Sequence, residues 1–292
     1  MKEKQQAFAN RIRSEANRLL WEVISDIHIT LPTDSKKLNQ AVQDMWNRKI
    51  RYAAVLGDLS NNGYSFQLKS CLNTLKEYPI QYLIALGNHD TYSLFHKDQI
   101  HIHPLYKEMV LKHHHSVYYD EVICDIHFYV LNSEQPDKSN AYYSQEQLDW
   151  LKKGLNNDDT NYPVFILCHH PLPDTHADTD DFTMHCGVQK SSILKILHQH
   201  PKAVYVSGHL HHDYDCCTPL FKEQTALIDV PSFTHVESGE DKGMCGYQIQ
   251  VFSDFLYIRT RNYANASWIK SQEFILDLST HLVIPFDADL LP

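Results

Sequence analysis

The chain has 292 residues, of which 43% are hydrophobic and 21% are charged, and its 36 acidic and 26 basic residues give a formal net charge of -10. This composition excludes a disordered or fibrous chain, and no apolar run approaches the twenty residues that a membrane-spanning helix needs. The negative charge argues against a protein that holds nucleic acid by broad neutralisation of phosphates.

The first eighteen residues are polar and charged, and they lack the apolar core of a secretory signal. Phe8, Ile12 and Leu19 fall at roughly helical spacing, so we expect residues 1–20 to form a helical extension that packs on the rest of the chain. The seven cysteines are an odd number and form no CxxC pair, which argues against a disulfide framework. We therefore expect a protein of the reducing cytoplasm.

From residue 21 onward, short apolar segments alternate with segments of helical periodicity. Such alternation implies parallel strands joined by right-handed crossovers, and strands of this kind are apolar throughout because both faces of the sheet are covered. The first five segments read as strand, helix, strand, helix and strand at 21–25, 37–48, 52–57, 66–78 and 80–87.

The later part of the chain mixes extended and helical segments. Residues 116–133 read as two strands around a turn, and Ser144 opens a helix with Gln147 at capping-box spacing. No linker or repeat divides the sequence, so we predict one domain over residues 21–292. Periodicity supports the class α/β, and the architecture we expect is a four-layer αββα sandwich of two packed mixed sheets flanked by helices. Further segments are strands at 162–168 and 202–208, a helix at 188–198, and a β-rich tail with a hairpin turn at Ser253-Asp254.

Side chains that can bind metals follow five of these strands, at the point where each strand ends. Because the carboxyl ends of parallel strands lie along one edge of a sheet, we expect these side chains to converge on one cleft. The five blocks are Asp26-Ile27-His28, Gly57-Asp58, Gly87-Asn88-His89-Asp90, His169-His170 and Gly208-His209-Leu210-His211.

The residue types in these blocks favour a metal centre. Carboxylate and amide oxygens and imidazole nitrogens suit Mn, Fe, Zn and similar ions, and no thiolate belongs to the set because Cys168 should point away from His169. The number of ligands exceeds what one tetrahedral ion needs. It suits two ions about 3.5–4 Å apart, which clamp a phosphoryl group and activate a water. Asp58 is short and central, as a bridging carboxylate would be.

The five blocks, in this order, resemble the signature of the calcineurin-like metallophosphoesterase family over residues 21–235. The resemblance implies two bound ions, and the ligand types leave Mn, Fe, Zn and Mg open. It assigns Asp26, His28 and His211 to one ion, Asn88, His169 and His209 to the other, and Asp58 to both.

The same resemblance implies a catalytic scheme. His89 would donate a proton to the leaving oxygen, Asp90 would orient and charge-stabilise that imidazole, and a metal-bridging hydroxide would attack phosphorus. The ions would also explain how a chain with a charge of -10 receives an anionic substrate.

A narrower resemblance points to the class III cyclic-nucleotide phosphodiesterase branch of this family. It implies a phosphodiesterase acting on a small nucleotide, such as a 3′,5′-cyclic nucleotide. From the charge and the hydropathy we expect neither broad nucleic-acid binding nor a membrane, and the sequence does not determine the oligomeric state. A phosphomonoesterase or phosphoprotein phosphatase is the alternative, and a non-catalytic scaffold is a weaker one because no ligand is missing. The segments concerned are Asn132-Ser133, 144–151, 167–171 and Pro231-Ser232.

Several polar residues near the blocks are weaker candidates. Asn62 could reach a phosphate oxygen, although Asn-Asn-Gly is also an ordinary turn signal. His170 could touch substrate or take a supporting position, and His212 is expected to face solvent. The acidic stretch 174–185 is expected to be a solvated loop, with a lid as the alternative, and the run 113–115 of three histidines a solvated loop.

Overall fold

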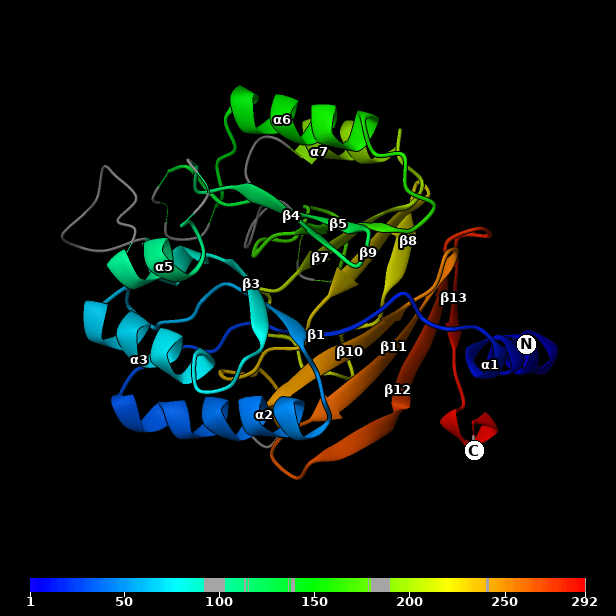
Figure 1. The fold of residues 1–292 in the computed structure, drawn as a ribbon, viewed down its shortest axis with the longest axis horizontal. Helices are drawn as coiled ribbons and strands as arrows, with labels where there is room; N and C mark the ends of the chain where they lie inside the picture. The colour runs from blue at the N-terminus through cyan, green and yellow to red at the C-terminus, as the bar shows by residue number, and fades with distance from the viewer. Residues whose placement is uncertain are drawn as a thin grey trace.

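The computed structural model describes residues 1–91, 103–112, 114, 116–135, 137, 140–177, 179, 190–239 and 242–291. Over these residues two mixed sheets lie at the centre, and helices cover their outer faces (Figure 1). The predicted α/β class and the four-layer αββα sandwich are therefore confirmed. Among the described helices, none combines the length and the apolar character needed to cross a bilayer.

The larger sheet has seven strands in the order β13-β12-β11-β10-β1-β2-β3. β1, β2 and β3 are parallel, as the alternating sequence pattern predicts. β10 pairs antiparallel with β1 and begins a meander through the remaining strands. The strands are β1 (Leu19–Ile24), β2 (Tyr52–Leu56), β3 (Gln81–Ala85), β10 (Cys245–Val251), β11 (Phe255–Asn262), β12 (Ser267–Asp277) and β13 (Leu282–Pro285).

The smaller sheet has six strands in the order β4-β5-β6-β7-β9-β8. Its inner strands β5, β6, β7 and β9 are parallel, and an antiparallel strand closes each edge. The strands are β4 (Tyr119–Ile123), β5 (Ile126–Val130), β6 (Val164–Leu167), β7 (Ala203–Ser207), β8 (Leu220–Lys222) and β9 (Thr225–Asp229).

Helices α6 and α7 cover the smaller sheet, and α2 and α3 cover the larger one (Figure 1). Leu148 and Leu151 on α6 share an apolar cluster with Val164 and Tyr205 of the sheet beneath, which holds the outer layer in place. The helices are α1 (Lys2–Ser14), α2 (Ser35–Asn47), α3 (Ser65–Leu75), α4 (Asn88–Thr91), α5 (Pro104–Met109), α6 (Gln145–Asn156) and α7 (Lys190–Leu197).

Some predicted boundaries are wrong. The N-terminal helix ends at Ser14 and does not reach Leu19, because Leu19 pairs with Val251 as the first residue of β1. α3 ends at Leu75, before the predicted Tyr78. Strands β12 and β13 were not predicted. Most of the acidic stretch 174–185, parts of the run 113–115 and the start of the predicted helix 188–198 lie outside the described residues.

The N-terminal helix packs against the far end of the larger sheet, away from the edge where β1, β2 and β3 end (Figure 1). The rings of Phe8 and Phe255 are 5.0 Å apart, and Arg11 donates to the Asp254 carboxylate at 2.7 Å. These contacts make α1 part of the scaffold, as its apolar spacing predicts.

Candidate metal centre

The five predicted blocks meet at one place, where strands from both sheets end. Asp26, Asp58 and Asn88 follow β1, β2 and β3 of the larger sheet, whereas His169 and His209 follow β6 and β7 of the smaller one. The expected convergence therefore occurs between the ends of two packed sheets, and not along the edge of a single sheet.

The first metal group consists of Asp26, His28, Asp58 and His211. His28 Nε2 lies 3.1 Å from His211 Nε2 and 3.3 Å from Asp58 Oδ2. Asp26 Oδ1 lies 3.9 Å from His28 Nε2 and 3.7 Å from His211 Nε2. Separations of this size are those of neighbouring ligand atoms around one ion with bonds of about 2.0–2.2 Å.

The second metal group, as we define it, consists of Asn88, His169 and His209; His170 also lies within reach of the two histidines as a possible ligand. His169 Nε2 lies 3.0 Å from Asn88 Oδ1 and 3.1 Å from His209 Nδ1. Asp58 Oδ2 lies 3.5 Å from His169 Nε2, so the same oxygen faces both groups. The seven side chains thus form two adjacent sets of donors with one carboxylate between them.

A cation fits these groups because their facing atoms are acceptors. His169 Nδ1 donates to the carbonyl oxygen of Leu56 at 2.7 Å, and His211 Nδ1 donates to that of His235 at 2.9 Å. A carbonyl can only accept, so in a neutral ring the Nε2 atom carries a lone pair. Those lone pairs face carboxylate oxygens and other ring nitrogens. Lone pairs that face one another repel, and a cation between them would be coordinated by them instead.

Buried polar atoms without hydrogen-bond partners support the same conclusion. Among the described residues, these atoms include Asp26 Oδ1 and Asp58 Oδ2. Buried polar atoms are normally satisfied, because leaving one without a partner costs about 1–3 kcal/mol. The donor set therefore fits a metal centre better than a hydrogen-bonded polar core.

The pKa values of the histidines in these groups also favour a positive charge beside Asp58. Burial lowers the pKa of His28 to about 3 and that of His209 well below its usual value, which favours the neutral imidazole that binds metals. Burial also acts to lower the pKa of His169, but the Asp58 carboxylate outweighs it and raises that pKa to about 10. The centre thus attracts either a proton or a cation beside Asp58.

Backbone conformation at the centre is unusual. Five of the seven side chains belong to residues with left-handed φ, a region that costs a non-glycine residue on the order of 1–3 kcal/mol and that often marks functional sites. The φ values are 57° at Asp26, 48° at His28, 48° at Asp58, 76° at His209 and 54° at His211.

Two glycines allow the loops to approach each other closely. Gly57 has φ +81°, and a Cβ there would lie 2.6 Å from His169 Nδ1. A Cβ on Gly87 would lie 1.9 Å from Asp58 Oδ1. Because real contacts of this kind are never so short, the glycines preceding Asp58 and Asn88 are steric requirements of the centre.

The predicted orientation of His89 by Asp90 is not what the structure shows. His89 Nδ1 donates to the carbonyl oxygen of Asn61 at 2.7 Å. The Asp90 carboxylate instead accepts from the backbone N–H groups of Leu59, Ser60 and Gly87 at 2.9–3.1 Å. A carboxylate three residues into a turn is well placed to bind such amides. Asp90 therefore fixes the loops after β2 and β3.

The remaining candidates lie beside the centre. Asn62 is exposed, and its amide oxygen accepts from Asn61 and Gln67 within its own loop. His170 is only 1% exposed and its ring lies 4.7 Å from that of His209, which favours a supporting position over contact with substrate.

Sequence reasoning missed His235 and underrated Asn61. His235 supplies the carbonyl that orients His211, and its ring lies 4.9 Å from that of His28. Asn61 orients His89 through its backbone, which no side-chain motif reveals. The nearest signal in the sequence is Pro231-Ser232, just before the loop that carries His235.

Two of the segments that resemble the phosphodiesterase branch hold the loop after β3 by hydrogen bonds. Asn132 Oδ1 accepts from the N–H of Leu86 at 2.6 Å, directly before Gly87. The backbone of Asn132 exchanges two hydrogen bonds with the Gln147 side chain, at 3.2 and 3.0 Å. These contacts tie the loop after β3 to β5 and α6.

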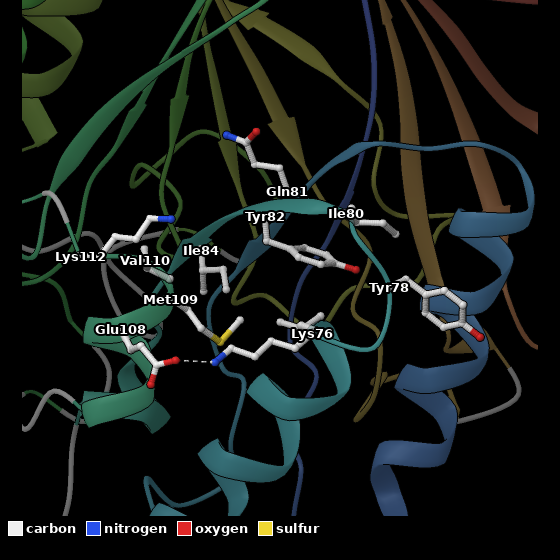
Figure 2. A pocket seen from close by; sticks show the side chains of 11 residues that line it. Lys76, Tyr78, Ile80, Gln81, Tyr82, Ile84, Glu108, Met109, Val110 and Lys112 are labelled. Atoms are coloured by element: carbon white, nitrogen blue, oxygen red, sulfur yellow. Dashed lines mark hydrogen bonds and ion pairs between the residues drawn. The ribbon is translucent and has the colours of Figure 1, made fainter.

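Cavities lie both beside the centre and away from it. A cavity of about 190 Å³ adjoins the first metal group and is lined by His28, Thr30, Asp34, Lys37 and His235, among others. Larger cavities of about 390 and 410 Å³ lie along β3 and α5. Figure 2 shows the side chains that line the first of these, including the Lys76–Glu108 ion pair. Their lining residues include none of the seven side chains of the two metal groups.

Comparison with known proteins gives consistent findings. The family model for calcineurin-like phosphoesterases matches residues 23–213. A relative from Moraxella catarrhalis (strain BBH18), described as a probable cyclic nucleotide phosphodiesterase, is 27% identical over 182 residues, which are 60% of this chain and 63% of that protein. The chain thus matches less than two thirds of that relative's length.

Two solved structures share the fold. A dimetal phosphatase from Danio rerio has a TM-score of 0.69 at 13% identity, over 90% of this chain and 100% of that one. A purple acid phosphatase from yellow lupin seeds has a TM-score of 0.58 at 13% identity, over 93% of this chain and 54% of that one. At this identity the likeness concerns the fold alone.

Proposed function

Because the chain belongs to the calcineurin-like phosphoesterase family, we propose that it is a dinuclear-metal phosphodiesterase that hydrolyses a small nucleotide, such as a 3′,5′-cyclic nucleotide. The observation that carries this proposal is the pair of metal groups that share Asp58 Oδ2. The relative from Moraxella catarrhalis supports the nucleotide class, through its description and its 27% identity.

Two cations held by these groups would neutralise charge on a bound phosphoester and activate a water for attack on phosphorus. The ligand types suit Mn, Fe, Zn or Mg, and availability would decide among them. The first metal group and Asn88, His169 and His209 would hold the ions, with Asp58 shared between them.

His89 is the residue of this chain that would supply a proton to the leaving oxygen. Its ring stands 4.8 Å from that of His28, and its Nδ1–H is committed to the Asn61 carbonyl. The proton for the leaving group would therefore be carried on Nε2. Asp90 contributes indirectly, by holding the loops that carry Asp58 and His89 in register.

The cavity beside the first metal group is the proposed place for the rest of the substrate. Lys37 and His235 line it, together with the backbone-anchored Thr234. A lysine and imidazoles offer favourable contacts to an anionic or polar nucleotide group, although the chain as a whole carries a charge of -10.

The central experiment combines metal analysis with hydrolysis of bis-p-nitrophenyl phosphate. Asn88→Ala and His169→Ala should each lower bound metal and reduce the rate by more than about 10²-fold, the loss that follows removal of one preorganised electrostatic contact. His198→Ala, which changes a partly exposed histidine beside Glu223 that belongs to neither metal group, is the matched control and should behave like wild type. Full activity in both site variants would refute the proposal.

Substrate preference is the second test. We expect the diester to be preferred over p-nitrophenyl phosphate, and cyclic nucleotides to be cleaved with manganese supplied. A strong preference for the monoester would favour a phosphomonoesterase on the same centre.

The odd number of cysteines supports a reducing, cytoplasmic location as part of this proposal.

A further inference from the structure

A third cluster of metal-binding side chains lies apart from the two metal groups. We call it the His212 group, and it consists of His212, Cys217 and Asp229. His212 and Cys217 belong to the segment after β7, and Asp229 is the last residue of β9, which neighbours β7 in the smaller sheet (Figure 1). One ligand atom from each residue lies within 4.8 Å of the others.

All three side chains are buried, although His212 was expected to face solvent. The exposed fractions are 5% for His212, 0% for Cys217 and 1% for Asp229. His211 precedes His212 with a left-handed φ of 54°, which turns the chain and sends the next side chain inward. A buried imidazole, thiol and carboxylate in contact are an unusual way to fill a protein interior.

The hydrogen bonds within the His212 group leave part of Asp229 unsatisfied. Its Oδ2 lies 2.8 Å from His212 Nδ1 and accepts from the Cys217 thiol at 3.4 Å. Its Oδ1 is buried and has no hydrogen-bond partner among the described residues. Burying a carboxylate oxygen without a partner is costly, and a cation bound by both oxygens of Asp229 would remove that cost.

The spacing matches a tetrahedral site after a small expansion. Bonds of about 2.0–2.2 Å to nitrogen and oxygen and about 2.3 Å to sulfur place N and O roughly 3.4 Å apart and S and O roughly 3.6 Å apart. The observed 2.8 and 3.4 Å are shorter by a few tenths of an ångström, as expected where a hydrogen bond draws the ligands together.

A buried hydroxyl lies on the same face of the smaller sheet as Asp229. Ser207 pairs with Asp229 across β7 and β9, so the two side chains project from the same face, and its buried hydroxyl lacks a hydrogen-bond partner within the described residues. His176 lies close enough to Asp229 and His212 to interact with both electrostatically.

We propose that His212, Cys217 and Asp229 form a third metal site for a zinc-like cation, separate from the dinuclear centre. A neutral imidazole, a thiolate and a carboxylate balance the charge of one divalent ion, and a thiolate selects zinc over magnesium or calcium. On binding, the Cys217 thiol proton passes to solvent, and the Nδ1 proton of His212 is replaced by one on Nε2. The ion would fix the segment that carries His209 and His211 to β9.

Cobalt titration of the full chain, after chelator treatment, tests the site. A thiolate bound to Co²⁺ gives a charge-transfer band in the near ultraviolet, and the seven side chains of the two metal groups contain no sulfur. Wild type should show this band, and its final intensity should correspond to one cobalt-bound thiolate per chain once all sites are filled. Cys217→Ala should lose it, and Cys71→Ala, which alters another fully buried cysteine, should keep it.

The dinuclear centre can be removed independently. Asp58→Asn combined with His169→Ala should abolish phosphoesterase activity but leave the thiolate band intact, so failure of the third site and failure of the proposed function are distinguishable. Asp229→Asn provides a second variant if Cys217→Ala does not fold, and it should weaken cobalt binding at this site. No band in wild type, or a band that survives in Cys217→Ala, would overturn the proposal.

Discussion

A methyl group at Gly87 should disable the metal centre without unfolding the protein. The added Cβ of Gly87→Ala would lie 1.9 Å from Asp58 Oδ1 and 2.4 Å from Asp58 N. A normal contact of about 3.5 Å requires the two loops to separate by roughly 1.5 Å. Asp58 then no longer faces both metal groups, since its Oδ2 sits 3.3 Å from His28 and 3.5 Å from His169.

Displacement of a reacting or positioning group by about 1 Å can cost on the order of 10² in rate, so we expect at least that loss in diester hydrolysis. Bound metal should fall in parallel, measured on the same preparation by elemental analysis. Gly154→Ala is the matched control, because its Cβ would meet the Tyr129 ring at 2.5 Å, in α6 and away from the centre. If Gly87→Ala kept its metal and its rate as Gly154→Ala does, the steric reasoning would be wrong.

Three further predictions concern the scaffold. Arg48→Met should destabilise the protein by about 3–5 kcal/mol in chemical denaturation, because Glu22, with a side chain 0% exposed, loses its cation; the double variant with Glu22→Gln should recover much of this. Burial acts to raise the pKa of Asp44, but hydrogen bonds from Arg261 and Arg48 outweigh it and lower that pKa. Its contribution is therefore complete above a pH of about 4 and is lost as pH falls through the folded-state pKa, so the stability gap between wild type and Asp44→Asn should close in acid, and a widening gap would contradict this. Ser144→Ala removes the hydroxyl that caps α6 and should lower stability by about 1 kcal/mol, whereas an unchanged thermal melt would show that the cap contributes nothing.

The centre could be predicted because its side chains follow strands whose pattern is local. Parallel strands that are covered on both faces appear in the sequence as short apolar runs. The first polar residues after such runs lie at the carboxyl-terminal edge of the sheet, whatever the order of the strands within it. The pairing of β1 with β10, and the division of strands between two sheets, depend on contacts across more than two hundred residues, which no local pattern contains. β12 escaped prediction because the first half of Ser267–Asp277 is largely exposed and shows no apolar alternation.

Side-chain roles within the loops were less predictable, because a loop has no fixed period. Asp90 follows His89 in sequence, yet its carboxylate accepts hydrogen bonds from three backbone amides. The ring of His89 donates instead to the carbonyl oxygen of Asn61. His212 follows an exposed-looking pattern of polar residues, yet a left-handed residue before it turns its ring inward. Both outcomes depend on backbone dihedral angles, which residue type alone does not determine for non-glycine residues.

Left-handed backbone and steric contact act together at this centre. The strained residues Asp26, His28 and Asp58 are held by hydrogen bonds between the loops, including His28 N to the Asp58 carbonyl at 2.8 Å. The adjoining glycines let those loops touch, and so the acceptor atoms are brought together before any ion arrives. Because of this preorganisation, the free energy needed to bring the acceptor atoms together is spent when the chain folds and not when the ion binds. A bound cation would then relieve the repulsion among the acceptor atoms of the folded chain. For this reason we expect folding and metal binding to be coupled in this protein.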